Sequence, residues 1–227
     1  MSVKRNRKRR GPGRPRDLIK LEAILDAAYA LFLERGVAAT TMDAVAERAF
    51  VSKMTVYANF RDKPALLSAV FDRRIKLMHA FDLAVGPDLN SSVERLVELG
   101  ELVASSASQP EVVRMVRLMT ECADEYPRLA AAFYAAGRGE LLKQIAAFLK
   151  ALTRRGFLSI KDPEPAAEQL VASWLGMSLV RQSLGLAGPP SSDAIAKRVR
   201  YAVETMVRAW ATGAEVDRGD KARFKRV

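Results

Sequence analysis

From residue 18 onward the apolar residues recur with the period of an α-helix, and this spacing limits the fold more than any other feature of the sequence. The first such run follows the spacing i, i+3, i+4, i+7, i+11 of a single helix face. Its members are Leu21, Ile24, Leu25, Ala28 and Phe32. No segment alternates apolar and polar residues in the way that marks a half-exposed strand. The sequence therefore predicts an all-α fold.

Short breaks divide the first part of this helical region. Gly36 stands just past the last apolar residue, where a helix-ending glycine is favoured. Thr41, Ser52 and Asp62 each precede a new helical run and can cap it. We therefore expect a long first helix, then two short helices joined by a tight turn, and a fourth helix at about 63–84. Two short helices braced by a longer one form a helix-turn-helix, a shape that fits the major groove of DNA.

The second short helix runs from Ser52 to Phe60. Val56 and Phe60 lie four residues apart and are expected to point inward. The outward side chains are then Lys53, Met54, Thr55, Tyr57 and Asn59. Ammonium, hydroxyl and amide groups can reach phosphate oxygens or base edges. The alternative interpretation is a short polar helix whose outer face meets only solvent.

Proline and glycine breaks also divide the rest of the chain. Further helices are predicted at roughly 90–107, 110–123, 127–153, 163–185 and 191–212. The expected organisation is a disordered basic arm (1–16), a helix-turn-helix domain (17–64) with the fourth helix as connector, a larger helical bundle (85–212) and a basic tail (213–227).

The positive charge is concentrated at the ends of the chain. The net charge is +11, of which residues 1–16 carry +8 and residues 213–227 carry +2. A basic arm favours an anionic partner, either nucleic acid or a membrane surface. Arg14 lies between Gly13 and Pro15, and Arg16 follows Pro15. This stretch resembles the Gly-Arg-Pro core of AT-hook peptides. Such arginines suit a narrow minor groove, and the alternative is a nonspecific electrostatic tether.

Several classes of protein lack support in the sequence. Cys122 is the single cysteine, so an internal disulfide is excluded; we expect a buried core thiol and a cytoplasmic protein. No apolar run is long enough to span a membrane. We find no His/Cys cluster with metal-ligand spacing, no nucleophile–base pair and no glycine-rich phosphate loop. We therefore expect no catalytic residue, no metal and no cofactor.

The helix-turn-helix segment closely resembles the DNA-binding domain of TetR/AcrR-family repressors. The matching residues are the run 40–49, Val51-Ser52-Lys53, Thr55-Val56-Tyr57, Phe60 and Lys63. The resemblance implies that Thr41 and Lys63 hold phosphates and that Lys53, Met54 and Thr55 face the major groove. It also implies that Tyr57 contacts a backbone phosphate and that Asn59 contacts either a phosphate or a base. The expected DNA-binding residues are Arg14, Arg16, Thr41, Ser52, Lys53, Met54, Thr55, Tyr57, Asn59 and Lys63.

Two positions depart from the family pattern. Phe50 stands where a glycine is usual, and a bulky residue takes a positive φ only with strain of roughly 1 kcal/mol or more. Either the turn is rebuilt, or Phe50 is strained while it packs against the first helix. Met54 stands where a smaller residue is common, and its thioether could meet a thymine methyl group.

The C-terminal half, at residues 111–136 and 162–169, resembles the ligand-binding half of AefR-like members of the same family. This resemblance implies a dimer and a small-molecule pocket, although many of the apolar residues would also suit an ordinary core. The expected pocket residues are Met115, Leu118, Met119, Cys122, Phe133, Phe148, Trp174 and Met177. The expected interface residues are Leu170, Trp174, Leu179, Leu184, Val199, Val203 and Met206.

The sequence as a whole therefore predicts a homodimeric, ligand-responsive DNA-binding regulator, which the resemblance suggests is a repressor. Its partners would be a palindromic double-stranded operator and a small apolar or aromatic effector, and it would not bind membranes. Two alternatives remain: an architectural DNA binder that uses only its arm and charge, and a small-molecule-binding helical enzyme.

Overall fold

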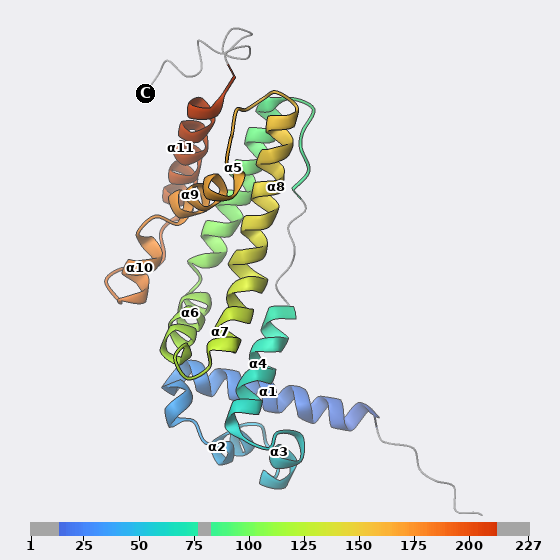
Figure 1. Cartoon of the computed structure of the whole chain (residues 1–227). Coiled ribbons are helices and arrows are strands. Elements are labelled where there is room, and N and C mark those ends of the chain that lie inside the picture. The colour runs from blue at the N-terminus through green and yellow to red at the C-terminus, as the bar shows by residue number, and fades with distance from the viewer. Residues whose placement is uncertain (1–13, 77–82, 213–227) are drawn as a thin grey trace, which may run out of the picture. The chain divides into compact units, whose positions relative to one another are not determined.

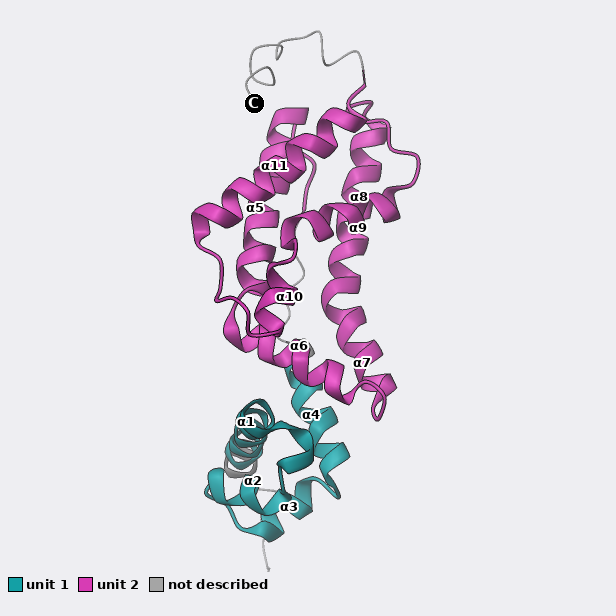
Figure 2. Ribbon diagram, turned by 90° about the vertical axis from the view of Figure 1, so that its left-hand side faces the viewer, with its two compact units in different colours: residues 1–76 teal, residues 77–227 magenta. Residues whose placement is uncertain are grey.

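The computed structural model of the chain describes residues 14–76 and 83–212, with the backbone alone at 14–17 and 75–76. Every regular element in these ranges is a helix, and the β-structure there is a single isolated bridge between Leu158 and Ala211. The chain divides into two compact units, residues 1–76 and residues 77–227 (Figure 2). The all-α fold is thereby confirmed.

The described part of the first unit, residues 14–76, consists of four helices, which Figure 1 labels. They are α1 (Arg14–Ala39), α2 (Met42–Arg48), α3 (Lys53–Asn59) and α4 (Lys63–Lys76). Its core uses the predicted apolar face of α1, since Ile24, Ala28 and Phe32 are at most 1% exposed. Val56 of α3 and Phe71 of α4 are also fully buried. The long first helix thus supplies the surface on which the shorter helices pack.

The predicted helix ends are confirmed in this unit. Gly36 has φ 79°, which breaks the helical geometry near the end of α1. The Thr41 hydroxyl accepts a hydrogen bond from Ala44 N at 3.1 Å, and Ser52 Oγ accepts from Thr55 N at 3.2 Å. Asp62 Oδ1 accepts from Ala65 N at 2.8 Å. Side-chain oxygens therefore satisfy amides that helix geometry leaves without partners.

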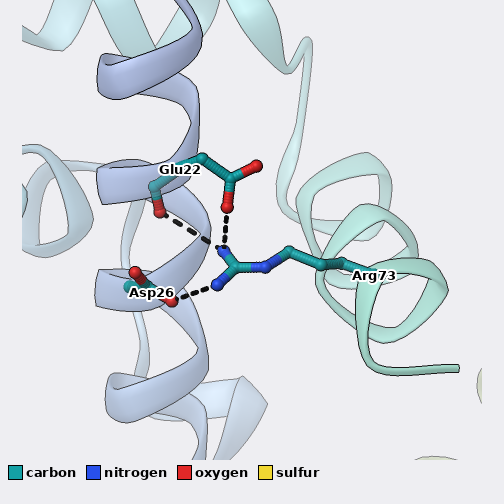
Figure 3. Close-up of polar contacts among 3 residues, drawn as sticks. All are labelled: Glu22, Asp26 and Arg73. Atoms are coloured by element: carbon teal, nitrogen blue, oxygen red, sulfur yellow. Dashed lines mark hydrogen bonds and ion pairs between the residues drawn. The ribbon is translucent and has the colours of Figure 1, made fainter. Parts of the chain in front are cut away.

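Two arginines of α4 bind to α1. Arg73 reaches the carboxylates of Glu22 at 2.9 Å and Asp26 at 2.6 Å, and it also donates to the Glu22 carbonyl (Figure 3). The guanidinium of Arg74 lies 3.7 Å from the ring centroid of Tyr29, a cation–π contact. These contacts fix the side of α4 that faces α1.

The second unit is a larger helical bundle. Its elements are α5 (Leu89–Ala107), α6 (Pro110–Cys122), α7 (Pro127–Tyr134), a π-helical turn (Ala135–Gly139), α8 (Glu140–Arg154), α9 (Pro163–Leu175), α10 (Ser178–Ser183) and α11 (Ser192–Trp210). The core lies between α5, α8, α9 and α11 (Figure 1). Arg200 of α11 holds Glu94 of α5 through two hydrogen bonds of 3.0 Å.

The N-terminal boundary of the first helix differs from the prediction. Residues 14–16 were assigned to the disordered arm, but they form the first turn of α1. Pro15 is tolerated there because amides in the first turn of a helix have no carbonyl partner within the helix, so the missing N–H of proline costs no hydrogen bond. Arginine also favours helices. The sequence predicted disorder at residues 14–16 because of the high positive charge of the arm, although these residues favour a helix. Residues 1–13 and the tail 213–227 lie outside the described residues.

Three other boundaries differ as well. The fourth helix was expected to reach residue 84, but Leu83 and Ala84 are not helical. The predicted helix at 163–185 is divided at Gly176, whose φ of 53° and ψ of −150° end α9 before α10 begins. The helix predicted at 127–153 contains the π-helical turn. Apolar periodicity runs through such breaks, so it cannot locate them.

Candidate DNA-binding surface

Helices α2 and α3 and the turn between them form the helix-turn-helix unit (residues 42–59). Val56 is fully buried and Phe60 is 8% exposed, so these two residues anchor α3 as predicted. Lys53, Met54, Tyr57 and Asn59 are exposed, and Thr55 is half-buried. The structure therefore brings the predicted outward residues together on one short helix. Their contacts with DNA stay predictions.

Three polar side chains of α3 have partners within the protein. Lys53 Nζ lies 2.5 Å from Asp43 Oδ2 on α2, and this hydrogen bond raises the pKa of Lys53. The hydroxyls of Ser52 and Thr55 are 2.9 Å apart. Asn59 Nδ2 donates to the carbonyl of Thr55 at 2.8 Å. Asp43 was not among the predicted site residues, since a helical spacing within α3 does not show which residue of α2 faces it.

The turn before α3 keeps the backbone conformation that favours glycine, although it carries Phe50. Phe50 has φ 53°. The amide of Phe50 donates to the carbonyl of Glu47 and that of Val51 donates to Ala46, which is the hydrogen-bond pattern of a Schellman motif with Phe50 at the left-handed position. The same pattern follows α8 and α10, where Gly156 and Gly185 occupy that position.

The turn is therefore not rebuilt, and Phe50 takes the strained left-handed conformation, which was the second of the two predicted outcomes. The expected packing against the first helix is wrong, because Phe50 is 94% exposed. A left-handed conformation costs a residue with a Cβ roughly 1–2 kcal/mol. In this structure no burial of the ring offsets that cost.

Apolar side chains are prominent on this surface. Phe50, Met54 and Tyr57 are 94%, 79% and 51% exposed, and they are three of the five large exposed apolar residues in the described part of the first unit. The other two, Leu18 and Ile19, belong to the first turns of α1. Large apolar groups that gather on an exposed surface commonly mark an interaction site.

The residues expected to hold phosphates have different surroundings. Thr41 is exposed at the start of α2, and its oxygen already serves as the helix cap. Lys63 Nζ donates to the carbonyls of Val37, Ala38 and Thr40 at 2.8, 3.1 and 3.1 Å. The ammonium thus binds the C-terminal end of α1, a role that sequence reasoning missed. A phosphate contact by Lys63 would have to replace at least one of these bonds.

The two arginines of the predicted arm lie on α1. The backbone of Arg14 and Arg16 is helical, whereas the sequence placed both residues in the disordered arm. Their side chains lie outside the described residues.

The predicted pocket residues fall into three groups in the second unit. Met115, Leu118, Met119 and Cys122 are buried along one face of α6, and burial raises the pKa of the Cys122 thiol. Phe148 and Trp174 belong to the central core, and Phe133 is half-buried. Met177 is 68% exposed, so its expected burial in a pocket is wrong. The pocket itself stays a prediction.

The predicted dimer interface needs a larger correction. Four of its members, Leu170, Trp174, Val199 and Val203, are at most 1% exposed in the core of a single protomer. Met206 packs partly against the same core and Leu179 is half-buried, whereas Leu184 is 67% exposed. The apolar surplus of these segments therefore fills the core of the bundle, which periodicity alone did not distinguish from an interface.

Among residues 14–76 and 83–212, no group of three or more His, Cys, Asp or Glu side chains is arranged to hold a metal ion. None of the helices described in these ranges has both the length and the apolar character needed to cross a membrane.

Comparisons with known families match both units. The family of tetR bacterial regulatory proteins matches residues 24–70, and the C-terminal domain of AefR-like transcriptional repressors matches residues 94–212. The uncharacterized HTH-type transcriptional regulator YdeS of Bacillus subtilis (strain 168) is 46% identical over 85 residues, which are 37% of this chain and 40% of that protein. The alignment thus spans well under two thirds of that relative.

Solved structures resemble the chain over most of its length. The flavonoid-responsive regulator FrrA is 29% identical with a TM-score of 0.69, covering 86% of this chain and 98% of that one. A TetR transcriptional regulator from Agrobacterium tumefaciens is 25% identical with a TM-score of 0.70, covering 86% and 95%. These three relatives are each described as a regulator.

Proposed function

Because this chain belongs to the TetR family of transcriptional regulators, we propose that it binds a palindromic operator as a homodimer and releases it when a small effector binds. The observation that carries the proposal is the geometry of α3. One side of this helix is anchored by Val56, and the rest of its surface exposes Lys53, Met54 and Tyr57. A short helix held in this way can enter the major groove and present side chains to base edges.

Selection from random duplex DNA by the purified full chain tests sequence-specific binding. We expect an enriched sequence with two-fold symmetry, since a symmetric dimer presents two identical α3 helices. Bound DNA with no enriched sequence would contradict the proposal and favour an architectural binder that recognises only the phosphate backbone.

A second copy of the chain is proposed to cover the exposed apolar stripe of α10. Met177, Val180 and Leu184 follow the spacing i, i+3, i+7 and are 68%, 47% and 67% exposed. Leu186, just beyond, is 68% exposed. This stripe replaces the buried core residues that sequence reasoning assigned to the interface.

The stripe extends toward α11. Arg198 of α11 donates to Ser178 Oγ of α10 at 2.8 Å and to the carbonyl of Trp174 at 2.6 Å. Tyr201, one helical turn after Arg198, is 62% exposed. We therefore propose that α10 and this face of α11 meet their counterparts in a self-complementary interface.

The molar mass in solution tests the dimer. Leu184→Glu places a charge in the proposed interface and should shift the protein toward a monomer. Leu102→Glu is the matched control, because Leu102 is a leucine of α5 with 52% exposure that lies outside the stripe. Dimers of equal stability in both variants would contradict this interface.

We propose that the effector binds within the second unit and is apolar or aromatic. The predicted pocket side chains of α6 and the core are methionine, leucine and aromatic residues, which adapt to irregular ligands. The relative FrrA is described as flavonoid-responsive. Operator affinity should fall when an effector is added, by the ratio of its affinities for the free and the DNA-bound forms. An affinity that no member of a broad apolar and aromatic set changes would favour constitutive binding.

Helix α4 is the proposed carrier of the signal to the first unit. Arg73 and Arg74 hold it to α1, so a displacement of α4 would be passed on to the rest of that unit. Arg73→Met should therefore weaken the response to effector more than operator binding itself. Equal responses in the wild type and in this variant would contradict the route.

A further inference from the structure

Met54 is the large side chain of α3 that lies most nearly opposite the buried face of the helix. In an α-helix, residues two positions apart lie about 200° apart around the axis. Met54 is therefore nearly opposite Val56, which is completely buried. Its 79% exposure agrees with this position. If α3 enters a major groove, this side chain extends furthest toward the floor of the groove.

Met54 is also in the part of α3 that meets base edges. Lys53 is the first and Met54 the second residue of the helix. The residues near the N-terminal end of the second helix of a helix-turn-helix are the ones that contact bases. The adjacent polar groups have other partners, since Lys53 binds Asp43 and the hydroxyls of Ser52 and Thr55 bind each other.

The chemistry of the side chain limits what it can recognise. A thioether has no hydrogen-bond donor and is only a weak acceptor. It therefore gains little from the carbonyl, amino and ring-nitrogen groups of the major groove. The apolar group exposed there by the four standard bases is the C5-methyl of thymine.

We propose that Met54 is a specificity-determining residue that packs on a thymine methyl group in each half of the operator. This inference rests on the proposed function, because it requires α3 to lie in the major groove. It adds which base one side chain selects and by which group. Loss of one methyl contact should weaken binding about fourfold per half-site, the typical effect of exposing one buried aliphatic carbon.

Replacement of thymine by deoxyuridine isolates this contact. Uracil keeps every hydrogen-bonding group of thymine and lacks only the methyl. Each thymine of the selected operator is replaced in turn, in both half-sites, and the affinity of the full chain is measured. We expect one thymine per half-site whose replacement weakens binding about fourfold per half-site.

The Met54 variants assign the effect to this side chain. Met54→Ala and Met54→Gln should bind the thymine and uracil operators equally, and Met54→Leu should retain the preference because it keeps an apolar side chain of similar size. Because Met54 is exposed, all three variants should fold, which thermal unfolding verifies. Phe50→Gly is the matched control: it removes another large exposed apolar side chain of this surface and should leave the preference unchanged.

The outcomes separate this inference from the proposed function. An enriched operator without a preference for thymine over uracil would overturn the inference alone, as would a preference that survives in Met54→Ala or disappears in Phe50→Gly. Failure to enrich any sequence would overturn the proposed function, and the inference with it.

Discussion

The ammonium of Lys53 lies 2.5 Å from the carboxylate Oδ2 of Asp43, so the helix proposed to read DNA is tied by its first residue to the helix before it. The pair holds α3 against α2. The ion pair also engages the ammonium of Lys53, which could otherwise bind a phosphate or a guanine edge. We therefore expect Asp43 to affect DNA binding without contacting DNA.

Replacement of Asp43 should strengthen DNA binding. Asp43→Asn removes a negative charge near the expected position of the phosphates and frees Lys53, so operator affinity should rise about fivefold at low salt. If Lys53 then binds a phosphate, the slope of log affinity against log salt should become steeper by about 0.9. Titrations of labelled operator at several salt concentrations measure both effects.

Glu34→Gln is the control for this prediction, because Glu34 also pairs with an exposed cation of α2, Arg48. It makes the same change in net charge away from α3. Equal gains in affinity for the Asp43 and Glu34 variants would mean that net charge alone is responsible.

Phe50→Gly should stabilise the first unit. Glycine takes a φ of 53° without strain, and the exposed ring contributes no burial that would be lost. The free energy of unfolding should increase by about 1 kcal/mol, the lower end of the cost of a left-handed conformation. Urea unfolding measures this change. Phe50→Ala removes the ring but keeps the strain, so it should show little of the gain, and a less stable glycine variant would show that the ring is packed in solution.

Lys63→Met should destabilise the first unit, because it leaves three carbonyls at the end of α1 without their charged donor. We expect a loss of about 1–3 kcal/mol in the free energy of unfolding, the usual range for a hydrogen-bonded charge at a helix C-terminus. The control is Lys20→Met on the exposed surface of α1, which should change stability by less than about 0.5 kcal/mol. Similar stability in the two variants would restore the sequence-based view of Lys63 as mainly a phosphate contact.

Acid should weaken two helix starts, one in each unit. Amide hydrogen bonds from Ala65 and Ser91 lower the pKa values of Asp62 and Asp88. A carboxyl whose pKa is lowered by folding stabilises the protein above its unfolded pKa, near 3.9, and this contribution is lost as the pH falls through the lower folded pKa. Stability should therefore be flat with respect to these groups above about pH 5 and fall below pH 4.

The variant Asp62→Asn tests this pH dependence. Its amide oxygen can still cap α4 but does not titrate in this range, so urea midpoints measured from pH 3 to 6 should fall less steeply than in the wild type. Asp72→Asn removes the same charge from the exposed surface of α4 without removing a cap. Parallel pH curves for the wild type and Asp62→Asn would show that the cap contributes no pH dependence.

The sequence predicted the first unit well because its determinants are local. Apolar spacing placed Val56 and Phe60 inside, and the residues at 41, 52 and 62 cap helices where their side-chain chemistry suggested. Contacts between distant residues were not predictable in this way. The bonds from Lys63 to the end of α1 and from Arg73 to Asp26 depend on how the helices pack, which periodicity does not encode.

In the second unit, the sequence was less informative. A run of apolar residues cannot tell a core from an interface, because both bury the same side chains. Leu170, Trp174 and Val199 were therefore assigned to the interface, although the bundle buries them within one protomer. Gly176 divides a helix that the apolar pattern continues through, and this break leads to the exposed stripe of α10.

The ratio of affinities for the selected operator and for a scrambled duplex of equal length, measured over a range of salt concentrations, tests the central claim most directly. Sequence-specific recognition by α3 predicts a ratio of about a thousandfold or more at physiological salt, which persists as both affinities fall with added salt. A ratio near one at every salt concentration would contradict the account, since the chain would then bind the phosphate backbone without reading the bases.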